Sequence, residues 1–218
     1  LKALELAPEN VRIWCRLATT YRFAGENEKA AETYKRAIEI DPDFQTNHFE
    51  LGQIFMDLKQ YEEAVSHFQK ASDLSEPNDG EAHDRLGDAL FVNGRYAEAV
   101  EAYREALDRQ PDSVLTLINL ATACIIKKEP DAEDIEEAVR CADRACELSG
   151  YRDPIILMKA CDVMAPAGEV DQAIANAQRA LEIARAMELD TLEWSIYERI
   201  VQLENGETAP PEPQGPVE

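Results

Sequence analysis

Apolar residues recur with a helical period along most of the chain. Near its beginning, Trp14, Leu17, Ala18 and Tyr21 are spaced i, i+3, i+4 and i+7, which places them on one face of an α-helix. Polar and charged residues occupy most of the positions between them, as expected of a helix with one buried side. The pattern predicts an all-α chain.

Short motifs recur along the chain at a nearly constant interval. Steps of 35 and 34 residues separate Leu51-Gly52, Leu86-Gly87 and Leu120-Ala121. Steps of 34, 35 and 34 residues separate Pro8, Pro42, Pro77 and Pro111. A fixed period of this length indicates one helix-turn-helix unit that is copied along the chain, rather than a domain with a single closed core.

Small residues share this register and predict where paired helices approach closely. One position holds Ala30, Ala64, Ala99, Ala138 and Ala173. Another position, seven residues later, holds Ala37, Ala71, Ala106, Ala145 and Ala180. Between them lie the aromatic residues Tyr34, Phe68 and Tyr103, which we expect to fill the space beside the next repeat.

These marks resemble the tetratricopeptide repeat pattern, in which Trp, Leu-Gly, Tyr, Ala, Phe, Ala and Pro stand at fixed offsets. The unit at 11–44 matches it through Trp14, Leu17, Tyr21, Ala30, Tyr34, Ala37 and Pro42. The units at 45–79 and 80–113 match through Leu51, Gly52, Phe55, Ala64, Phe68 and Ala71, and through Leu86, Gly87, Ala99, Tyr103, Ala106 and Pro111. The resemblance implies a right-handed superhelical solenoid, whose first helices line a concave groove that holds a peptide or a helix.

The same register divides the chain. Residues 1–10 are expected to end a preceding repeat helix, and five repeats follow at 11–44, 45–79, 80–113, 114–150 and 151–185. The fourth repeat carries five extra residues near 128–134, where Asp131 or Asp134 is expected to cap the next helix. Residues 186–204 are predicted to form a capping helix, apolar toward the last repeat and polar outward. The tail at 205–218 contains four prolines and three glutamates, and is predicted to be disordered.

Composition narrows the classes of partner. The 44 acidic and 22 basic residues give a net charge of −22, which disfavours nucleic acid because its phosphates are repelled. No run of 18 apolar residues is present, so no membrane insertion by this chain is expected. The five cysteines are an odd number and form no Cys-x-x-Cys motif. They are interpreted as reduced packing residues, which favours a cytoplasmic location.

Motifs for catalysis are not evident, and the chain is predicted not to be an enzyme and to bind no cofactor. No nucleophile elbow, phosphate-binding glycine loop or metal-ligand cluster is found in the sequence. His48 and His83 occupy the position of Trp14 in successive repeats, and we interpret them as helix-contact residues rather than ligands. His67 is expected on an outward face.

The resemblance assigns the predicted groove to side chains of the first helices. The candidate binding residues are Phe49, Glu50, Gln53, Met56, Asp57, Glu81, Asp84, Arg85, Asp88, Phe91, Leu115, Ile118, Asn119, Thr122, Ile125, Ile126, Ile155 and Met158. Acidic residues dominate the earlier members and apolar residues the later ones. A contiguous exposed apolar patch normally marks an interaction site. We therefore expect a protein or peptide ligand that is basic over one part and apolar, or amphipathic, over the other.

One ligand class known in this family is disfavoured. A clamp for chaperone C-terminal carboxylates needs Lys, Asn, Asn, Lys and Arg at five positions. These positions here hold Cys15, Thr19, Glu50, Glu81 and Arg85, so only the last one matches. Glutamate in place of asparagine and lysine would repel a carboxylate.

Two alternatives remain open. The apolar stripe is also suited to self-association, which would make the chain a scaffold for assembly. The end of the chain, with Trp194, Tyr197, Leu203 and a Pro-rich tail, is similar to the close of membrane glycosyltransferases that carry these repeats. In that case the chain would be the C-terminal appendage of a larger enzyme.

Overall fold

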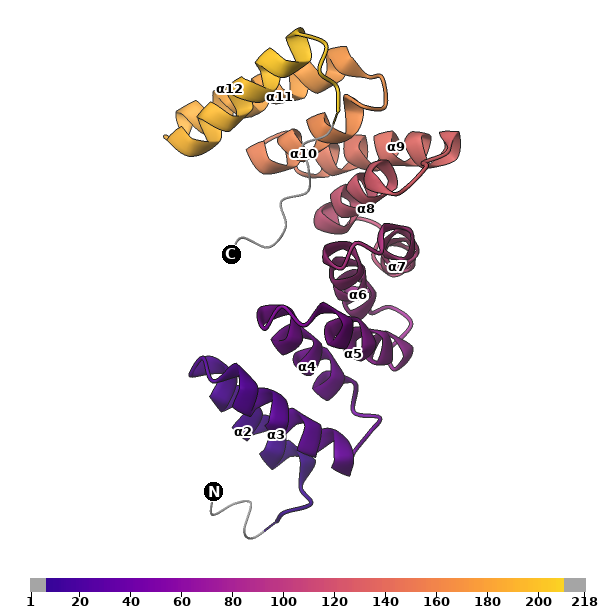
Figure 1. The fold of residues 1–218 in the computed structure, drawn as a ribbon, viewed down its shortest axis with the longest axis vertical. Coiled ribbons are helices and arrows are strands. Elements are labelled where there is room, and N and C mark those ends of the chain that lie inside the picture. The colour runs from indigo at the N-terminus through magenta and orange to yellow at the C-terminus, as the bar shows by residue number, and fades with distance from the viewer. Residues whose placement is uncertain (1–6, 210–218) are drawn as a thin grey trace. The chain divides into compact units, whose positions relative to one another are not determined.

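The structure, a computed structural model, describes residues 7–209 and consists there of helices joined by short turns (Figure 1). Within these residues there are eleven helices and no strand, which confirms the predicted all-α fold class. The chain divides into two compact units, Leu1–Arg95 and Tyr96–Glu218, which we call the N-terminal and the C-terminal unit. The boundary lies between the two helices of the predicted repeat 80–113.

Over its described residues 7–95, the N-terminal unit contains two complete helix pairs and one further helix. Its helices are α2 (Val11–Phe23), α3 (Asn27–Ile40), α4 (Gln45–Asp57), α5 (Tyr61–Asp73) and α6 (Glu81–Val92). The second helix of each pair packs antiparallel to the first through a turn of a few residues, for example at Gly25, whose φ of 75° favours glycine.

The C-terminal unit contains six helices in the described residues. They are α7 (Tyr96–Arg109), α8 (Val114–Ile126), α9 (Ala132–Leu148), α10 (Pro154–Met164), α11 (Val170–Ala186) and α12 (Asp190–Glu204). The side chain of Asp131 caps α9 and accepts hydrogen bonds from the backbone N–H groups of Glu133 and Asp134. The carboxylate of Asp134 accepts from the backbone N–H of Asp131 in return, so the expected cap is a reciprocal capping box.

The core lies between paired helices and uses the small residues that the register identifies. All ten alanines of the two predicted positions are buried, as are Tyr34, Phe68 and Tyr103. A methyl group at Gly52 would lie 2.9 Å from two ring carbons of Phe68. Glycine therefore lets the aromatic ring of α5 rest against the backbone of α4, which explains the Leu-Gly mark.

The last helix differs from the expectation for a cap. Its inner side is buried through Ile196, Ile200 and Leu203, but Trp194 and Tyr197 are exposed on the other side. That side also carries exposed polar residues such as Ser195, Glu198 and Gln202, so aromatic side chains interrupt the predicted polar outward face. The expectations for a preceding helix before residue 7 and for a disordered tail after residue 209 lie outside the described residues. Among the described helices, none has the length and apolar character needed to cross a bilayer.

Candidate functional site

Most of the predicted binding residues form an accessible first-helix face, the surface of the first helices that their paired helices leave uncovered. In the N-terminal unit, Asp57 and Glu81 are exposed. Partly exposed are Phe49, Glu50, Gln53, Met56, Asp84, Arg85, Asp88 and Phe91. These side chains come from α4 and α6, so the repeat register places them on the surface as predicted.

Two arginines neutralise much of the acidic character of this face. Arg22 of α2 forms an ion pair with Glu50 of α4, and its Nη2 donates to Gln53 Oε1 at 2.6 Å. Arg85 Nη1 lies 2.9 Å from Asp88 and 3.9 Å from Asp84. Among the five acidic residues of the predicted groove, only Asp57 and Glu81 pair with no basic side chain within the described chain.

A pocket lies on this face between α2, α4, α5 and α6. It encloses about 310 Å³ and is lined by Arg22, Gln53, Met56, Asp57, Phe68, Arg85 and Asp88. Five of these seven residues belong to the predicted binding set. The other two are Arg22, which the repeat register also places on the groove side of the first repeat, and Phe68, which belongs to a second helix.

The first-helix face of the C-terminal unit is apolar at two prominent positions. Leu115 is 62% exposed on α8 and Ile155 is 57% exposed on α10. Asn119 accepts a hydrogen bond from Lys159 Nζ at 3.0 Å, which joins α8 to α10. Partly exposed beside them are Thr122, Ile125, Ile126 and Met158.

Ile118 corrects the predicted set. Its side chain is 0% exposed, so it packs inside the C-terminal unit and cannot contact a ligand on the face. The helix Val114–Ile126 carries apolar residues on nearly every side, because it is covered by more than one neighbouring helix. Its sequence therefore has no polar stripe that distinguishes an accessible isoleucine from a buried one.

The histidines are packing residues. His48 Nε2 donates to the carbonyl oxygen of Pro42 at 3.0 Å, and His48 Nδ1 lies 3.1 Å from His67 Nδ1. Because Pro42 can only accept, His48 Nδ1 accepts and His67 Nδ1 donates. The ring of His67 also stacks on Phe55, so the expectation that His67 faces outward is wrong. Burial, then the neighbouring His48 and Lys35, lowers the pKa of His67 to about 4.

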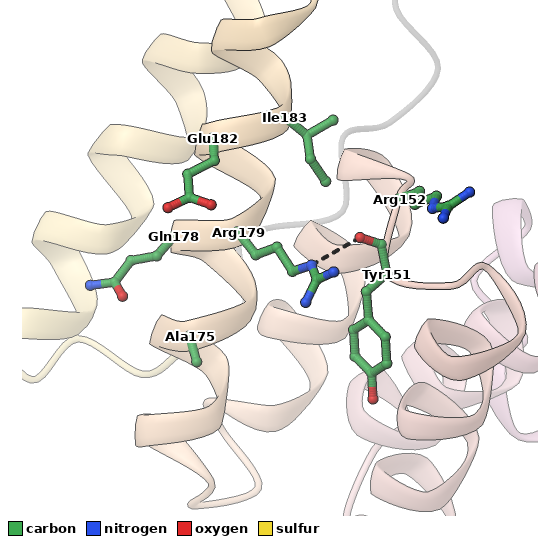
Figure 2. A pocket seen from close by; sticks show the side chains of 7 residues that line it. All are labelled: Tyr151, Arg152, Ala175, Gln178, Arg179, Glu182 and Ile183. Carbon is green, nitrogen blue, oxygen red and sulfur yellow. Dashed lines mark hydrogen bonds between the residues drawn. The ribbon is translucent and has the colours of Figure 1, made fainter.

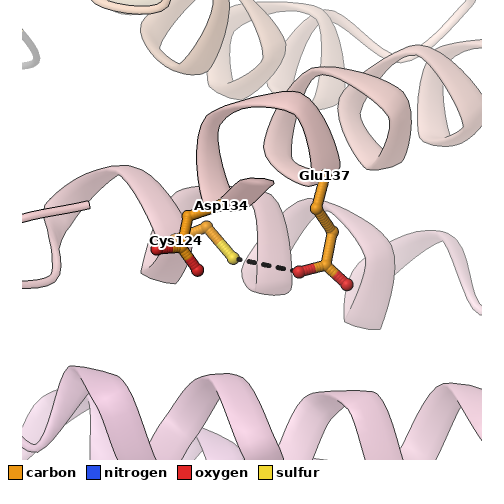
Figure 3. Close-up of side chains that lie close together, drawn as sticks. All are labelled: Cys124, Asp134 and Glu137. Carbon is orange, nitrogen blue, oxygen red and sulfur yellow. Dashed lines mark hydrogen bonds between the residues drawn. The ribbon is translucent and has the colours of Figure 1, made fainter. Parts of the chain in front are cut away.

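Cys124, Asp134 and Glu137 form the one cluster of potential metal ligands found in the described residues (Figure 3). Cys124 Sγ lies 3.8 Å from a carboxylate oxygen of Glu137. Arg104 Nε donates to Glu137 at 3.1 Å, and Lys127 forms an ion pair with Asp134. Burial and then Glu137 raise the pKa of the Cys124 thiol to about 12. Positive side chains thus already compensate both carboxylates, and we interpret the cluster as an ion-pair network rather than a metal site.

A larger depression lies on the C-terminal unit, away from the first helices (Figure 2). It encloses about 610 Å³ and is lined by Tyr151, Arg152, Ala175, Gln178, Arg179, Glu182 and Ile183. Arg179 Nε donates to the carbonyl oxygen of Tyr151 at 3.0 Å. The guanidinium of Arg179 also lies 5.2 Å from the centre of the Tyr151 aromatic ring. Arg152 points away from Arg179 in Figure 2, so the polar groups do not converge on one ligand position. We assign no site to this depression.

Comparison with families places tetratricopeptide repeats along the first half of the chain. Three family models match: a tetratricopeptide repeat at residues 1–32, a TPR repeat at 20–59 and a tetratricopeptide repeat at 49–114. Together they run from residue 1 to residue 114 without a gap.

Curated relatives carry the same repeats within longer proteins. The small glutamine-rich tetratricopeptide repeat-containing protein 2 of Mycosarcoma maydis is 35% identical over 94 residues, which is 43% of this chain and 26% of the relative. The DnaJ homolog subfamily C member 7 homolog of Schizosaccharomyces pombe is 27% identical over 92% of this chain and 36% of its own length. Human protein O-mannosyl-transferase TMTC1 is 29% identical over 65% of this chain and 15% of its length. The chain thus spans well under two thirds of these relatives.

Solved structures share the fold at low sequence identity. YrrB, described as a TPR protein with an unusual peptide-binding site, superposes with a TM-score of 0.73 at 18% identity and covers 90% of this chain and 96% of its own. MamA superposes with a TM-score of 0.71 at 18% identity, over 82% of this chain and 93% of its own.

Proposed function

We propose that this chain, which belongs to the tetratricopeptide repeat family, is a protein-interaction module whose N-terminal unit binds a peptide segment through a Lys or Arg side chain. The observation that carries the proposal is the pocket of about 310 Å³ on the first-helix face. In this pocket, Asp57 is exposed and pairs with no basic side chain of the described chain.

The charge balance around the pocket favours a cation. Arg22 pairs with Glu50, and Arg85 lies 2.9 Å from Asp88 and 3.9 Å from Asp84, whereas the carboxylate of Asp57 pairs with no basic side chain of the described chain. Complementary charge guides binding and excludes wrong partners more than it adds affinity. Met56 and Phe68 supply apolar contacts for the methylene groups of a long basic side chain.

The first-helix face of the C-terminal unit supplies the apolar part of the proposal. Leu115 and Ile155 are exposed aliphatic side chains on neighbouring first helices, and no packing within their unit covers them. Exposed apolar area of this kind suits apolar ligand residues. Peptide binding by the structural neighbour YrrB supports a peptide as the kind of ligand.

Selection from a phage-displayed library of random dodecapeptides tests the proposal. We expect enriched peptides to carry Lys or Arg, and to bind Asp57→Asn about threefold to fivefold more weakly than the unsubstituted chain. Glu63→Gln is the matched control, because it removes the same charge from an exposed residue of α5 that lies outside both the pocket and the predicted binding set, and it should change affinity by less than about twofold. Peptides that bind both variants equally well would refute the pocket as the binding site.

A second candidate function places this chain within a larger enzyme. The match to human protein O-mannosyl-transferase TMTC1 covers 65% of this chain and favours a parent protein of that class. We propose in that case that catalysis lies outside these residues and that the repeats bind a protein. Sequencing the transcript upstream of Leu1 tests this alternative: segments that span a membrane are expected, and their absence would remove it.

A further inference from the structure

Each of the five predicted repeats has the same four-residue stripe on its first helix, and in the first, second, fourth and fifth repeats the second helix packs against that first helix. The stripes are Trp14, Leu17, Ala18 and Tyr21; His48, Leu51, Gly52 and Phe55; His83, Leu86, Gly87 and Leu90; Leu117, Leu120, Ala121 and Cys124; and Leu157, Ala160, Cys161 and Met164. All members of the second, fourth and fifth stripes are buried. The third member is always small (Ala18, Gly52, Gly87, Ala121 and Cys161), and at Gly52 the ring of Phe68 on the second helix rests against the backbone.

The helix α12 carries the same spacing, but its stripe is open. The corresponding residues are Trp194, Tyr197, Glu198 and Val201. Trp194 is 64% exposed and Tyr197 is 49% exposed, and their ring centres lie 6.2 Å apart. No helix follows α12 in the described residues, so the surface that a second helix covers in the other repeats is left bare.

The side of α12 opposite the open stripe packs against the preceding helices, as the first helix of a further repeat would. Arg199 Nε donates to Asp162 at 2.9 Å and joins α12 to α10, as Lys159 and Asn119 join α10 to α8. Ile196 is fully buried beneath it. The open stripe is therefore presented by a helix that is firmly packed, and its exposure is a property of the folded unit.

We propose that α12 is an acceptor for an amphipathic helix of a partner protein, and that this helix carries Lys or Arg opposite Glu198. Trp194, Tyr197 and Val201 supply apolar contacts in the register of the stripes that α3, α5, α9 and α11 cover. Glu198 stands where the other repeats have glycine, alanine or cysteine, so an aromatic residue in the manner of Phe68 would collide with it. A basic residue instead forms an ion pair with Glu198.

Charge favours a partner over a second copy of this chain. The net charge of −22 opposes self-association. Beside Trp194 and Tyr197, a surface pocket of about 280 Å³ is lined by Asp190, Glu193 and Arg185, and Arg185 pairs with Glu193. The second helices of this chain place Tyr34, Phe68 or Tyr103 at the position that would meet Glu198. None of them supplies the required basic residue.

Two stapled helical peptides with the sequence of residues 27–40 test the proposal, one unchanged and one with Tyr34→Lys. Trp14→Phe leaves Trp194 as the sole tryptophan of the chain, so its emission reports binding at α12. We expect the Tyr34→Lys peptide to shift the emission saturably, with an affinity about fivefold higher than that of the unchanged peptide. Glu198→Gly should reverse this preference, because it reopens the space for the aromatic ring.

Three outcomes would overturn the proposal. The first is that neither peptide changes the emission of Trp194. The second is that Tyr197→Asp, which places a charge within the stripe, leaves the affinity unchanged while circular dichroism shows an intact fold. The third is self-association in sedimentation that Trp194→Ala abolishes, which would make a second copy the occupant.

Discussion

The two units handle charge in opposite ways. In the N-terminal unit, ion pairs such as Arg22–Glu50 lie on the accessible first-helix face, with about a third of each side chain exposed. In the C-terminal unit, that face carries Leu115 and Ile155, and the notable ion pairs are inside, where Asp134 and Arg199 are buried. Surface pairs contribute little to stability, whereas breaking a buried pair costs several kcal/mol. If the proposed function holds, charge adjusts ligand preference in the first unit, whereas in the second unit buried ion pairs join neighbouring helices.

The largest expected effect separates the buried and accessible residues of α8. Ile118→Ala removes a fully buried side chain and should lower the free energy of unfolding of the C-terminal unit by about 2–5 kcal/mol. Leu115→Ala on the same helix should cost less than about 1 kcal/mol, because Leu115 is mostly exposed. Urea unfolding followed by Trp194 emission in the Trp14→Phe background measures both. Equal costs would place Ile118 on the accessible face after all.

The second-largest expected effect tests whether the buried ion pairs around Asp134 stabilise the C-terminal unit. Asp134→Ala leaves Lys127 without its partner and removes the capping box of α9, so we expect a loss of about 2–3 kcal/mol. Glu133→Ala is the matched control, since Glu133 is exposed in the same first turn. Burial alone would raise the pKa of Asp134, but hydrogen bonds from Lys127 and Asp131 outweigh it and hold the pKa below its ordinary value.

This contribution has a defined pH dependence. A carboxylate with a lowered pKa stabilises the fold above its unfolded pKa of 3.8, and the stabilisation is lost as the pH falls through the folded value. The Asp134→Ala and unsubstituted chains should therefore converge in stability below about pH 3.8. A difference that persists unchanged at pH 3 would contradict the ion-pair interpretation.

In the N-terminal unit, acid sensitivity should begin at higher pH because of His67. Its pKa is lowered from 6.5 to about 4, so the unfolded chain binds the proton first as the pH falls. Stability is then full above pH 6.5 and declines toward pH 4, by about 1–2 kcal/mol after allowance for partial exposure of the ring. His67→Asn keeps a donor for His48 but does not titrate, and should flatten this decline when Trp14 emission is followed in a Trp194→Phe background.

The features that the sequence could predict are residues that recur because every repeat makes the same helix–helix contact. Buried alanines recur at each helix contact, so their period reports helix pairs directly. Gly52 is needed because Phe68 rests against its backbone, and the Leu-Gly mark follows from that contact. The capping residue Asp131 was predictable for the same reason, since a local hydrogen bond links residues only two or three positions apart.

Features that depend on distant partners could not be predicted in this way. The pairing of Arg22 with Glu50 and of Arg199 with Asp162 depends on side-chain rotamers across helices, which no periodicity records. Ile118 was misplaced because α8 is apolar on nearly every side. The exposed aromatic residues of α12 were misjudged because a first-helix stripe has the same spacing with or without a second helix to cover it.

The smallest expected effect concerns a turn that is built with glycine at the end of α2 and with glutamate at the end of α11. At the end of α2, Gly25 has a φ of 75° and the N–H of Glu26 donates to Tyr21 O at 2.9 Å. At the end of α11, Glu188 has a φ of 56° and the N–H of Leu189 donates to Ala184 O at 2.9 Å. The left-handed conformation costs a non-glycine residue about 1–2 kcal/mol, and glycine loses about 0.5–1 kcal/mol of chain entropy on folding.

The difference between the left-handed strain and the entropy cost of glycine decides whether each substitution stabilises or destabilises its unit. Glu188→Gly should stabilise the C-terminal unit by about 0.5 kcal/mol, because relief of the left-handed strain exceeds the added entropy cost. Gly25→Ala should destabilise the N-terminal unit by about 1 kcal/mol, because it introduces the same left-handed strain. No atom lies close enough to the new methyl group to add a steric clash. Urea unfolding followed by Trp194 and by Trp14 measures the two changes separately. If both substitutions shift stability in the same direction, the backbone conformation of this turn does not control it.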